Sequence, residues 1–222
     1  MEQEISSPSD KKGVILDAAI ELFSEHGFDA TSVRMVADKA GVNVAMISYY
    51  FGSKDKMFEE LIVRKTEYMR NQLTSLAENT EMNPWEKIVA LIDSYTGRIL
   101  KSGGGFHRVL VRELSLRQRM ETSKIIEERF EFNHVVFRSM IEDGIKKQFF
   151  RSEIDIPMLM NMMIGTITQS TMSASLVCKM MNLEMEKDGS TPPEALRLRV
   201  KEHLTNVFAH YLLIDPKHYT TK

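Results

Sequence analysis

Apolar residues recur every three or four positions through almost the whole chain, which is the period of an amphipathic helix. No run of alternating β-branched and polar residues predicts a strand, and no Asn-Gly or Asp-Gly pair joins two such runs. We expect a first helix from about Ser9 to His26, with Gly27 as a left-handed stop. Its buried face is formed by Ile15, Ala18, Ala19, Leu22 and Phe23.

Two short helices follow, each with clear end signals. Thr31 or Ser32 caps the first of them, and Gly41 ends it. Asn43 caps the second, which runs to about Phe51. A longer helix and two short ones, joined by tight turns, are therefore expected within the first quarter of the chain.

The later helices are longer. The polar segment 184–191 separates the last two, and the glycine run 103–105 is a flexible break. The chain is predicted to be an all-α protein of about nine helices. Those after the third are expected at about residues 54–77, 84–100, 106–116, 120–147, 156–182 and 193–213.

The composition is that of a soluble globular protein, with 43% hydrophobic and 27% charged residues in 222. A single cysteine, Cys178, excludes an internal disulfide and favours a reducing compartment. The polar segment Met1 to Lys12 lacks the apolar stretch of a secretory signal. No segment reaches the ~20 apolar residues that a membrane span requires. We therefore expect a cytoplasmic protein.

Residues 28–58 carry the chemistry. Two short helices that meet at a tight turn and share a small buried interface are typical of a helix-turn-helix, in which the second of them lies in the major groove. Ala37, Ala40, Gly41, Val42 and Ile47 supply that interface. The formal net charge of −2 does not itself suggest a nucleic-acid partner. The local pattern predicts double-stranded DNA as the partner.

The predicted contacts divide by chemistry. Val44, Ala45 and Met46 are small or amphipathic groups that can approach thymine methyls. Hydroxyl groups and cations are expected to hold phosphates, Lys54 together with the helix amides beside it. The full predicted DNA-binding set is Thr31, Ser32, Arg34, Asn43, Val44, Ala45, Met46, Ser48, Tyr49, Tyr50 and Lys54.

This stretch resembles the DNA-binding domain of TetR-family repressors. The resemblance covers roughly residues 10–60 in one unbroken register. Many members have Tyr in place of Ser48, Gly in place of Ala45 and Leu in place of Met57. The residues that carry it are Ile15, Ala19, Leu22-Phe23, Gly27-Phe28, Thr31-Ser32-Val33, Ala40-Gly41-Val42, Tyr49-Tyr50-Phe51 and Ser53-Lys54.

The resemblance implies two domains. The first is a three-helix DNA-binding domain over residues 8–54, with its recognition helix at about 43–51. The second is a helical ligand-binding and dimerisation domain over 55–215. The last two long helices, about 156–182 and 193–213, would form a homodimer interface. Its apolar faces would run through Leu159, Met163, Ile167, Leu204, Phe208 and Tyr211.

The implied function is that of a repressor that binds a palindromic operator as a dimer and is released by a small molecule, which we expect to be apolar or amphipathic. Two alternatives stay open: control by a protein partner, and ligand binding without DNA binding. The methionines of 156–182 are interpreted first as core or interface residues. His107, His134, His203 and His210 form no close metal pair, and no catalytic constellation stands out. We expect neither an enzyme nor a bound cofactor or metal.

Overall fold

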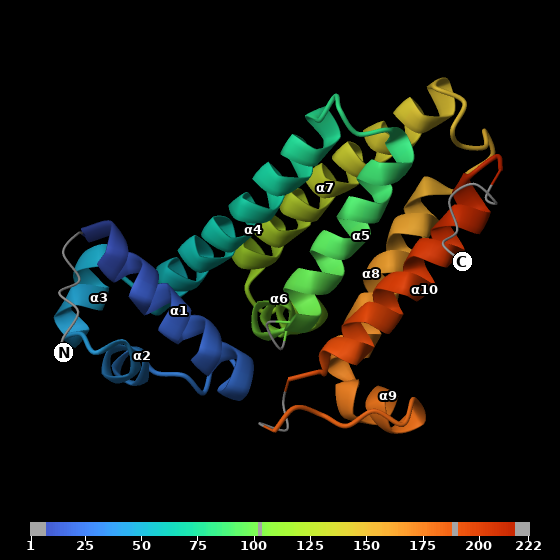
Figure 1. Cartoon of the computed structure of the whole chain (residues 1–222). Coiled ribbons are helices and arrows are strands. Elements are labelled where there is room, and N and C mark those ends of the chain that lie inside the picture. The colour runs from blue at the N-terminus through green and yellow to red at the C-terminus, as the bar shows by residue number, and fades with distance from the viewer. Residues whose placement is uncertain (1–7, 102–103, 188–190, 216–222) are drawn as a thin grey trace. The chain divides into compact units, whose positions relative to one another are not determined.

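The computed structural model describes residues 8–101, 104–187 and 191–215, and within them the chain forms ten helices and no strand (Figure 1). The all-α prediction is confirmed. Gly103 and residues 188–190 of the predicted breaks lie outside the described residues. The helices are α1 Pro8–His26, α2 Val33–Ala40, α3 Val44–Phe51, α4 Lys54–Glu78, α5 Pro84–Lys101, α6 Gly105–Leu116, α7 Met120–Lys146, α8 Ile156–Met172, α9 Ala174–Met180 and α10 Glu194–Leu212.

The single helix predicted over 156–182 is divided into α8 and α9. Asp155 caps α8 as expected, since its carboxylate accepts the Met158 amide at 3.1 Å. The helix ends at Ser173, whose backbone (φ −114°, ψ 32°) leaves the helical region. Two residues earlier, the Thr171 hydroxyl donates to the Ile167 carbonyl at 2.8 Å. Hydroxyl groups that bond back to the preceding turn bend helices, which periodicity alone does not reveal.

The contacts divide the chain into two compact units. The first comprises residues 1–68 and 105–128, and the second comprises 69–104 and 129–222. The first unit is thus larger than the domain expected over 8–54, because α6 packs against α1. The functional boundary at residue 54 stays a prediction.

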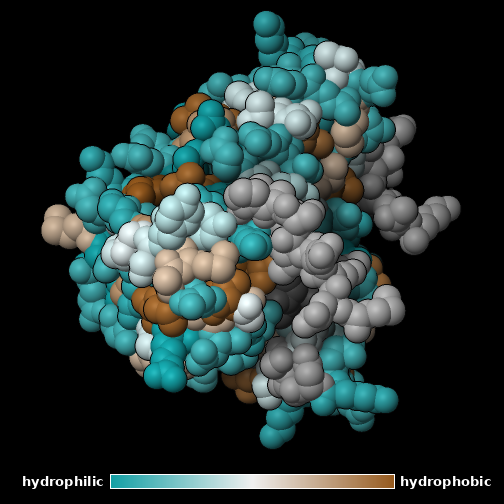
Figure 2. All heavy atoms as spheres, turned by 90° about the vertical axis from the view of Figure 1, so that its left-hand side faces the viewer, coloured by the Kyte–Doolittle hydropathy of each residue, from teal (hydrophilic) through white to brown (hydrophobic). Residues whose placement is uncertain are grey.

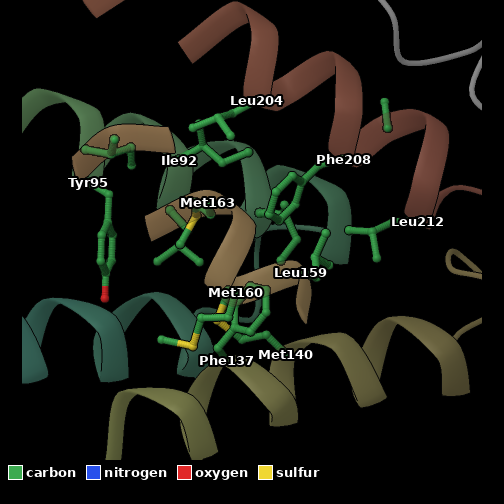
Figure 3. Packing of buried hydrophobic residues seen from close by; sticks show 14 of the residues in the cluster. Ile92, Tyr95, Phe137, Met140, Leu159, Met160, Met163, Leu204, Phe208 and Leu212 are labelled. Carbon is green, nitrogen blue, oxygen red and sulfur yellow. The ribbon is translucent and has the colours of Figure 1, made fainter. Parts of the chain in front are cut away.

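In the second unit, α5 packs against both α8 and α10, and these helices enclose most of the core (Figure 3). Leu159, Met163 and Ile167 of α8, and Leu204 and Phe208 of α10, are all buried inside the protomer. These side chains were expected on a dimer face, and that expectation is wrong. They belong to one core cluster with residues of α5 and α7, because helices that pack together turn their apolar stripes toward one another.

The turn between α7 and α8 is fixed to the end of α10. The Arg151 amide donates to the Leu212 carbonyl at 2.8 Å, and the Ile214 amide donates to the Phe149 carbonyl at 3.2 Å. Phe150 is buried in this corner directly above Gly144. None of the helices in the described part of the chain is long and apolar enough to cross a membrane.

Candidate DNA-binding site

The helix-turn-helix begins with a well-capped α2. The Ser32 hydroxyl accepts the Met35 amide at 3.1 Å, so Ser32 and not Thr31 is the N-cap. Gly41 ends α2 with a left-handed backbone (φ 66°), and the Val42 amide then donates to the Ala37 carbonyl at 3.0 Å. The turn between α2 and α3 is thereby closed by backbone hydrogen bonds.

Helix α3 is anchored on one side only. Asn43 caps it as predicted, with its Oδ1 accepting the Ala45 amide at 2.8 Å. Ile47 and Phe51 are buried in the core of the first unit. Gly52 (φ 77°) makes the turn into α4, whose first amides include that of Lys56 bonded to the Ser53 hydroxyl.

The opposite side of α3 and the start of α2 are open. Tyr49 is 84% exposed and Val44 is 40% exposed. The two adjacent tyrosine rings, Tyr49 and Tyr50, meet edge to face at 5.3 Å. Figure 2 shows this side of the molecule as mostly hydrophilic surface with patches of hydrophobic side chains. The predicted contact residues that lie exposed or half-exposed are Ser32, Arg34, Asn43, Val44, Ala45, Met46, Ser48, Tyr49 and Tyr50.

Thr31 does not fit its predicted role. Its side chain is fully buried, and its hydroxyl donates to the carbonyl of Gly27 at 2.8 Å. A hydroxyl held in this way inside the α1–α2 turn is not available to a phosphate. The sequence could not separate Thr31 from Ser32, because either residue is a good cap and only the fold decides which of the two hydroxyls is buried.

Lys54 is also placed differently from expectation. Its ammonium donates to the carbonyls of Phe28 and Thr31, both at 2.9 Å, and lies 4.1 Å from the centre of the Phe28 ring. These contacts use the charge inside the protein, between the start of α4 and the α1–α2 turn. In this arrangement Lys54 stabilises the helix-turn-helix, and its ammonium is not available for the predicted phosphate contact.

One further group near the site was missed from the sequence. Arg119, which directly precedes α7, donates to Asp29 in the α1–α2 turn at 2.6 Å. The two residues are 90 positions apart, and neither belongs to a motif. No signal in a single sequence joins them.

Comparisons with known proteins support the interpretation of this segment as a DNA-binding helix-turn-helix. Residues 15–61 match the family model described as bacterial regulatory proteins, tetR family. A protein named as a probable HTH-type transcriptional regulator, YttP of Bacillus subtilis, is 29% identical over 141 residues, which is 62% of this chain and 66% of that protein. The HTH-type transcriptional repressor KstR2 of Mycobacterium tuberculosis is 24% identical over 162 residues, covering 72% and 78% of the two chains.

The chain carries a DNA-binding segment of the TetR family. It is a helix-turn-helix transcriptional regulator, as the sequence pattern predicted. Its relatives are named as regulators and not as enzymes. The resemblance of residues 10–60 to the DNA-binding domain of TetR-family repressors is therefore confirmed by the family model and by these named relatives.

Solved structures of TetR-family proteins share the fold along nearly the whole chain. The structure of KstR2 of M. tuberculosis gives a TM-score of 0.68 at 20% identity and covers 96% of this chain and 98% of that one. The B. subtilis regulator FadR, solved in complex with stearoyl-CoA, gives a TM-score of 0.62 at 23% identity, covering 87% and 97%. At this identity the likeness establishes the architecture: a helix-turn-helix followed by a larger helical region.

Among the described residues, no group of three or more His, Cys, Asp or Glu side chains is arranged to hold a metal ion. His107 is buried on α6, and burial lowers its pKa to about 4. It is therefore a neutral core residue at physiological pH. Cys178 is buried as well, and burial raises the pKa of its thiol.

Proposed function

We propose that the protein is a transcriptional repressor that binds a palindromic operator as a homodimer and leaves it when a small molecule binds. The arrangement of α3 carries the DNA-binding part. Ile47 and Phe51 anchor the helix, while Val44, Ala45 and Tyr49 remain exposed. A short helix that is fixed on one side and open on the other fits the major groove of B-DNA, which is about 12 Å wide.

The proposed contacts divide into two groups. Val44, Ala45 and Met46, in the first turn of α3, would meet base edges. Ser32, Arg34, Asn43, Ser48 and the two tyrosines would hold phosphates on either side of the groove. We leave Thr31 and Lys54 out of this set, because their polar atoms bond to the protein itself.

An operator selection tests this assignment. A random duplex library selected with the wild-type protein is expected to yield an inverted repeat. Its half-sites should be separated by one helical turn of about 34–36 Å or a near multiple. Binding should weaken steeply with salt, because displaced counterions dominate the affinity. Recovery of no preferred sequence, at any salt concentration, would overturn the repressor function.

A homodimer would follow from the two-fold symmetry of such an operator, and TetR-family regulators are dimeric. We propose that α8 and α10 form the interface, through side chains that the protomer leaves exposed. Leu198 and Tyr211 on α10 and Met158 on α8 are of this kind. Leu198→Glu should give a monomer in size-exclusion chromatography with light scattering. Val135→Glu, which alters an equally exposed apolar residue on α7, should leave the dimer intact.

The effector site that we propose is a groove between the second half of α4 and α5. Its apolar walls include Leu73, Leu76 and Leu91, and Tyr95 and Arg98 lie along the same groove. Figure 3 shows the Tyr95 ring directed toward α4. Such a surface, apolar with a cation and a phenol beside it, suits an amphipathic anion.

The groove encloses about 180 Å³, which is smaller than the ~300–1,000 Å³ of typical ligand pockets. A larger ligand would therefore have to separate α4 from α5. Because α4 begins at Lys54, directly after the recognition helix, binding at its far half would favour a different placement of its start. This is the proposed route from ligand to operator release.

Stearoyl-CoA is the first probe, because the FadR structure contains it. We expect it to release the selected operator, and coenzyme A alone to have no effect. In Leu76→Trp the groove is filled, so the operator should be bound normally but no longer released. If stearoyl-CoA and a panel of other amphiphiles all leave the complex intact, the effector assignment is wrong and control by a protein partner becomes the better interpretation.

A further inference from the structure

One arginine outside the helix-turn-helix holds the turn that leads into α2. Arg119 Nη2 donates to Asp29 Oδ1 at 2.6 Å, and its Nη1 donates to Glu113 Oε2 on α6 at 2.7 Å. The same guanidinium lies 3.8 Å from the centre of the Phe28 ring. A single planar group therefore joins α6 to two successive residues of the α1–α2 turn.

The two carboxylates bonded to Arg119, those of Glu113 and Asp29, differ in burial and therefore in how much they depend on its positive charge. Glu113 is 3% exposed, and its Oε1 has no hydrogen-bond partner among the described residues. A buried carboxylate of this kind requires a counter-charge, so Glu113 keeps Arg119 in place. The Asp29 side chain is 72% exposed, so water can solvate its carboxylate when the ion pair opens. The bond to Asp29 is therefore the one that can open while the fold stays intact.

The corner that carries Arg119 is fixed to α7. Arg117 adopts a left-handed backbone (φ 48°), and its guanidinium pairs with Glu127 on α7. The Arg119 carbonyl accepts the Ser123 amide at 2.9 Å, inside the first turn of α7. A movement of the beginning of α7 must therefore carry the Arg119 guanidinium with it.

A second arginine of α6 lies against the same turn. A Cβ atom placed on Gly27 would come within 2.6 Å of Arg112 Cζ, so this guanidinium rests directly on the Gly27 backbone. The turn is thus in contact with arginines of α6 and of the α6–α7 corner at consecutive residues. It ends at Ser32, whose hydroxyl caps α2.

We propose that Arg119 is a positioning residue for DNA binding: it holds the α1–α2 turn, and through the Ser32 cap the start of α2, in the orientation that engages the operator. Displacement of the α6–α7 corner opens the Asp29 bond and weakens the protein's hold on DNA. The inference rests on the proposed DNA-binding function and adds a point at which that function is regulated.

Asp29→Asn tests the replaceable half of the contact, and Asp17→Asn is the matched control. Both remove one exposed, ion-paired carboxylate of the first unit, since Asp17 pairs with Lys65 at 2.9 Å. Any general gain in DNA affinity from the lost negative charge is therefore the same in both. We expect amide exchange of residues 27–32 to rise by up to about five-fold in Asp29→Asn alone, as the loss of an exposed ion pair allows. Affinity for the selected operator should fall by a similar factor relative to Asp17→Asn.

Arg119→Lys is the second variant. Lysine keeps a positive charge beside Glu113. It lacks the planar guanidinium that can bond to two carboxylates and stack on a ring at the same time. Operator affinity should fall at least about five-fold, which is the lower end of typical coupling between sites. The slope of log affinity against log salt should stay unchanged, because Arg119 contacts no phosphate in this scheme.

The outcomes separate the inference from the function on which it rests. A wild-type protein that selects no duplex overturns the proposed function. If the wild-type protein binds its operator, and Arg119→Lys equals wild type in affinity while Asp29→Asn equals Asp17→Asn in affinity and amide exchange, the positioning role alone is overturned. A salt slope reduced by about one per subunit in Arg119→Lys would make this residue a direct phosphate contact and would also overturn it.

Discussion

The ammonium of Lys54 lies 4.1 Å from the centre of the Phe28 ring and donates a hydrogen bond to the Phe28 carbonyl at 2.9 Å. One side chain thus binds both the backbone and the ring of a residue 26 positions earlier. The start of α4, directly behind the recognition helix, is joined in this way to the turn that precedes α2. The lysine of the Ser53-Lys54 pair therefore has a structural role in this chain, because it bonds to other parts of the helix-turn-helix domain.

The main effect of Lys54→Gln should therefore be a loss of folding stability and not a change in the DNA sequence that the protein prefers. Two charge-assisted hydrogen bonds and a cation–π contact are lost, and the free energy of unfolding should fall by about 1–3 kcal/mol. The measurement is urea denaturation followed by circular dichroism. Lys56→Gln, two residues away and exposed, should be indistinguishable from wild type. An unchanged midpoint with a salt slope reduced by about one would instead restore the phosphate contact that the sequence suggested.

The open side of α3 gives two different expectations for DNA binding. Tyr49→Phe removes a hydroxyl proposed to bind phosphate, so affinity should fall a few-fold on all sequences alike. Val44→Ser alters a group proposed to meet base edges, so the selected sequence itself should change. Both residues are exposed, and neither substitution should move the melting temperature. Tyr68→Phe, an exposed tyrosine of α4, is the control; an equal loss there would remove Tyr49 from the site.

Much of the first unit follows from local sequence signals. Caps and stops such as Ser32, Gly41 and Asn43 act within a few residues, so the pattern predicts the ends of α2 and α3 correctly. The roles of Thr31 and Lys54 could not be predicted in the same way. A threonine or lysine looks the same in the sequence whether its polar group contacts DNA or bonds to a backbone carbonyl. Only the tertiary fold decides between these two roles.

The second unit was harder to predict for a related reason. Periodicity marks Leu159, Met163 and Phe208 as apolar helix positions but does not say what covers them. In the structure they pack into one cluster with residues of α5 and α7, so they belong to the core of one protomer. The Arg119 contacts lie beyond any local pattern, since they join segments that meet only after the chain has folded back.

Two glycines should respond in opposite ways to the same substitution. A Cβ on Gly144 would lie 2.1 Å from the ring of Phe150, which is buried in the α7–α8 corner, so Gly144→Ala should cost several kcal/mol through overpacking. Gly97 lies in the middle of α5 with nothing within 4 Å of its Cβ position. Gly97→Ala should stabilise the protein by about 1 kcal/mol, because alanine is the better helix former. Thermal unfolding of the two variants measures both; a change of the same sign in each would refute the assigned packing.

Stability should depend on pH through His107. Burial lowers the pKa of this histidine from 6.5 to about 4, so between those values the unfolded chain binds a proton that the folded chain does not. The free energy of unfolding is therefore unaffected above pH 7 and falls as the pH drops from 6.5 toward 4, by about 2 kcal/mol at pH 5. His107→Gln cannot bind this proton and should lose most of the difference between pH 7.5 and pH 5 in urea denaturation. His203→Gln, on the exposed side of α10, should keep it. An equal pH response in wild type and His107→Gln would show that other groups cause the acid sensitivity.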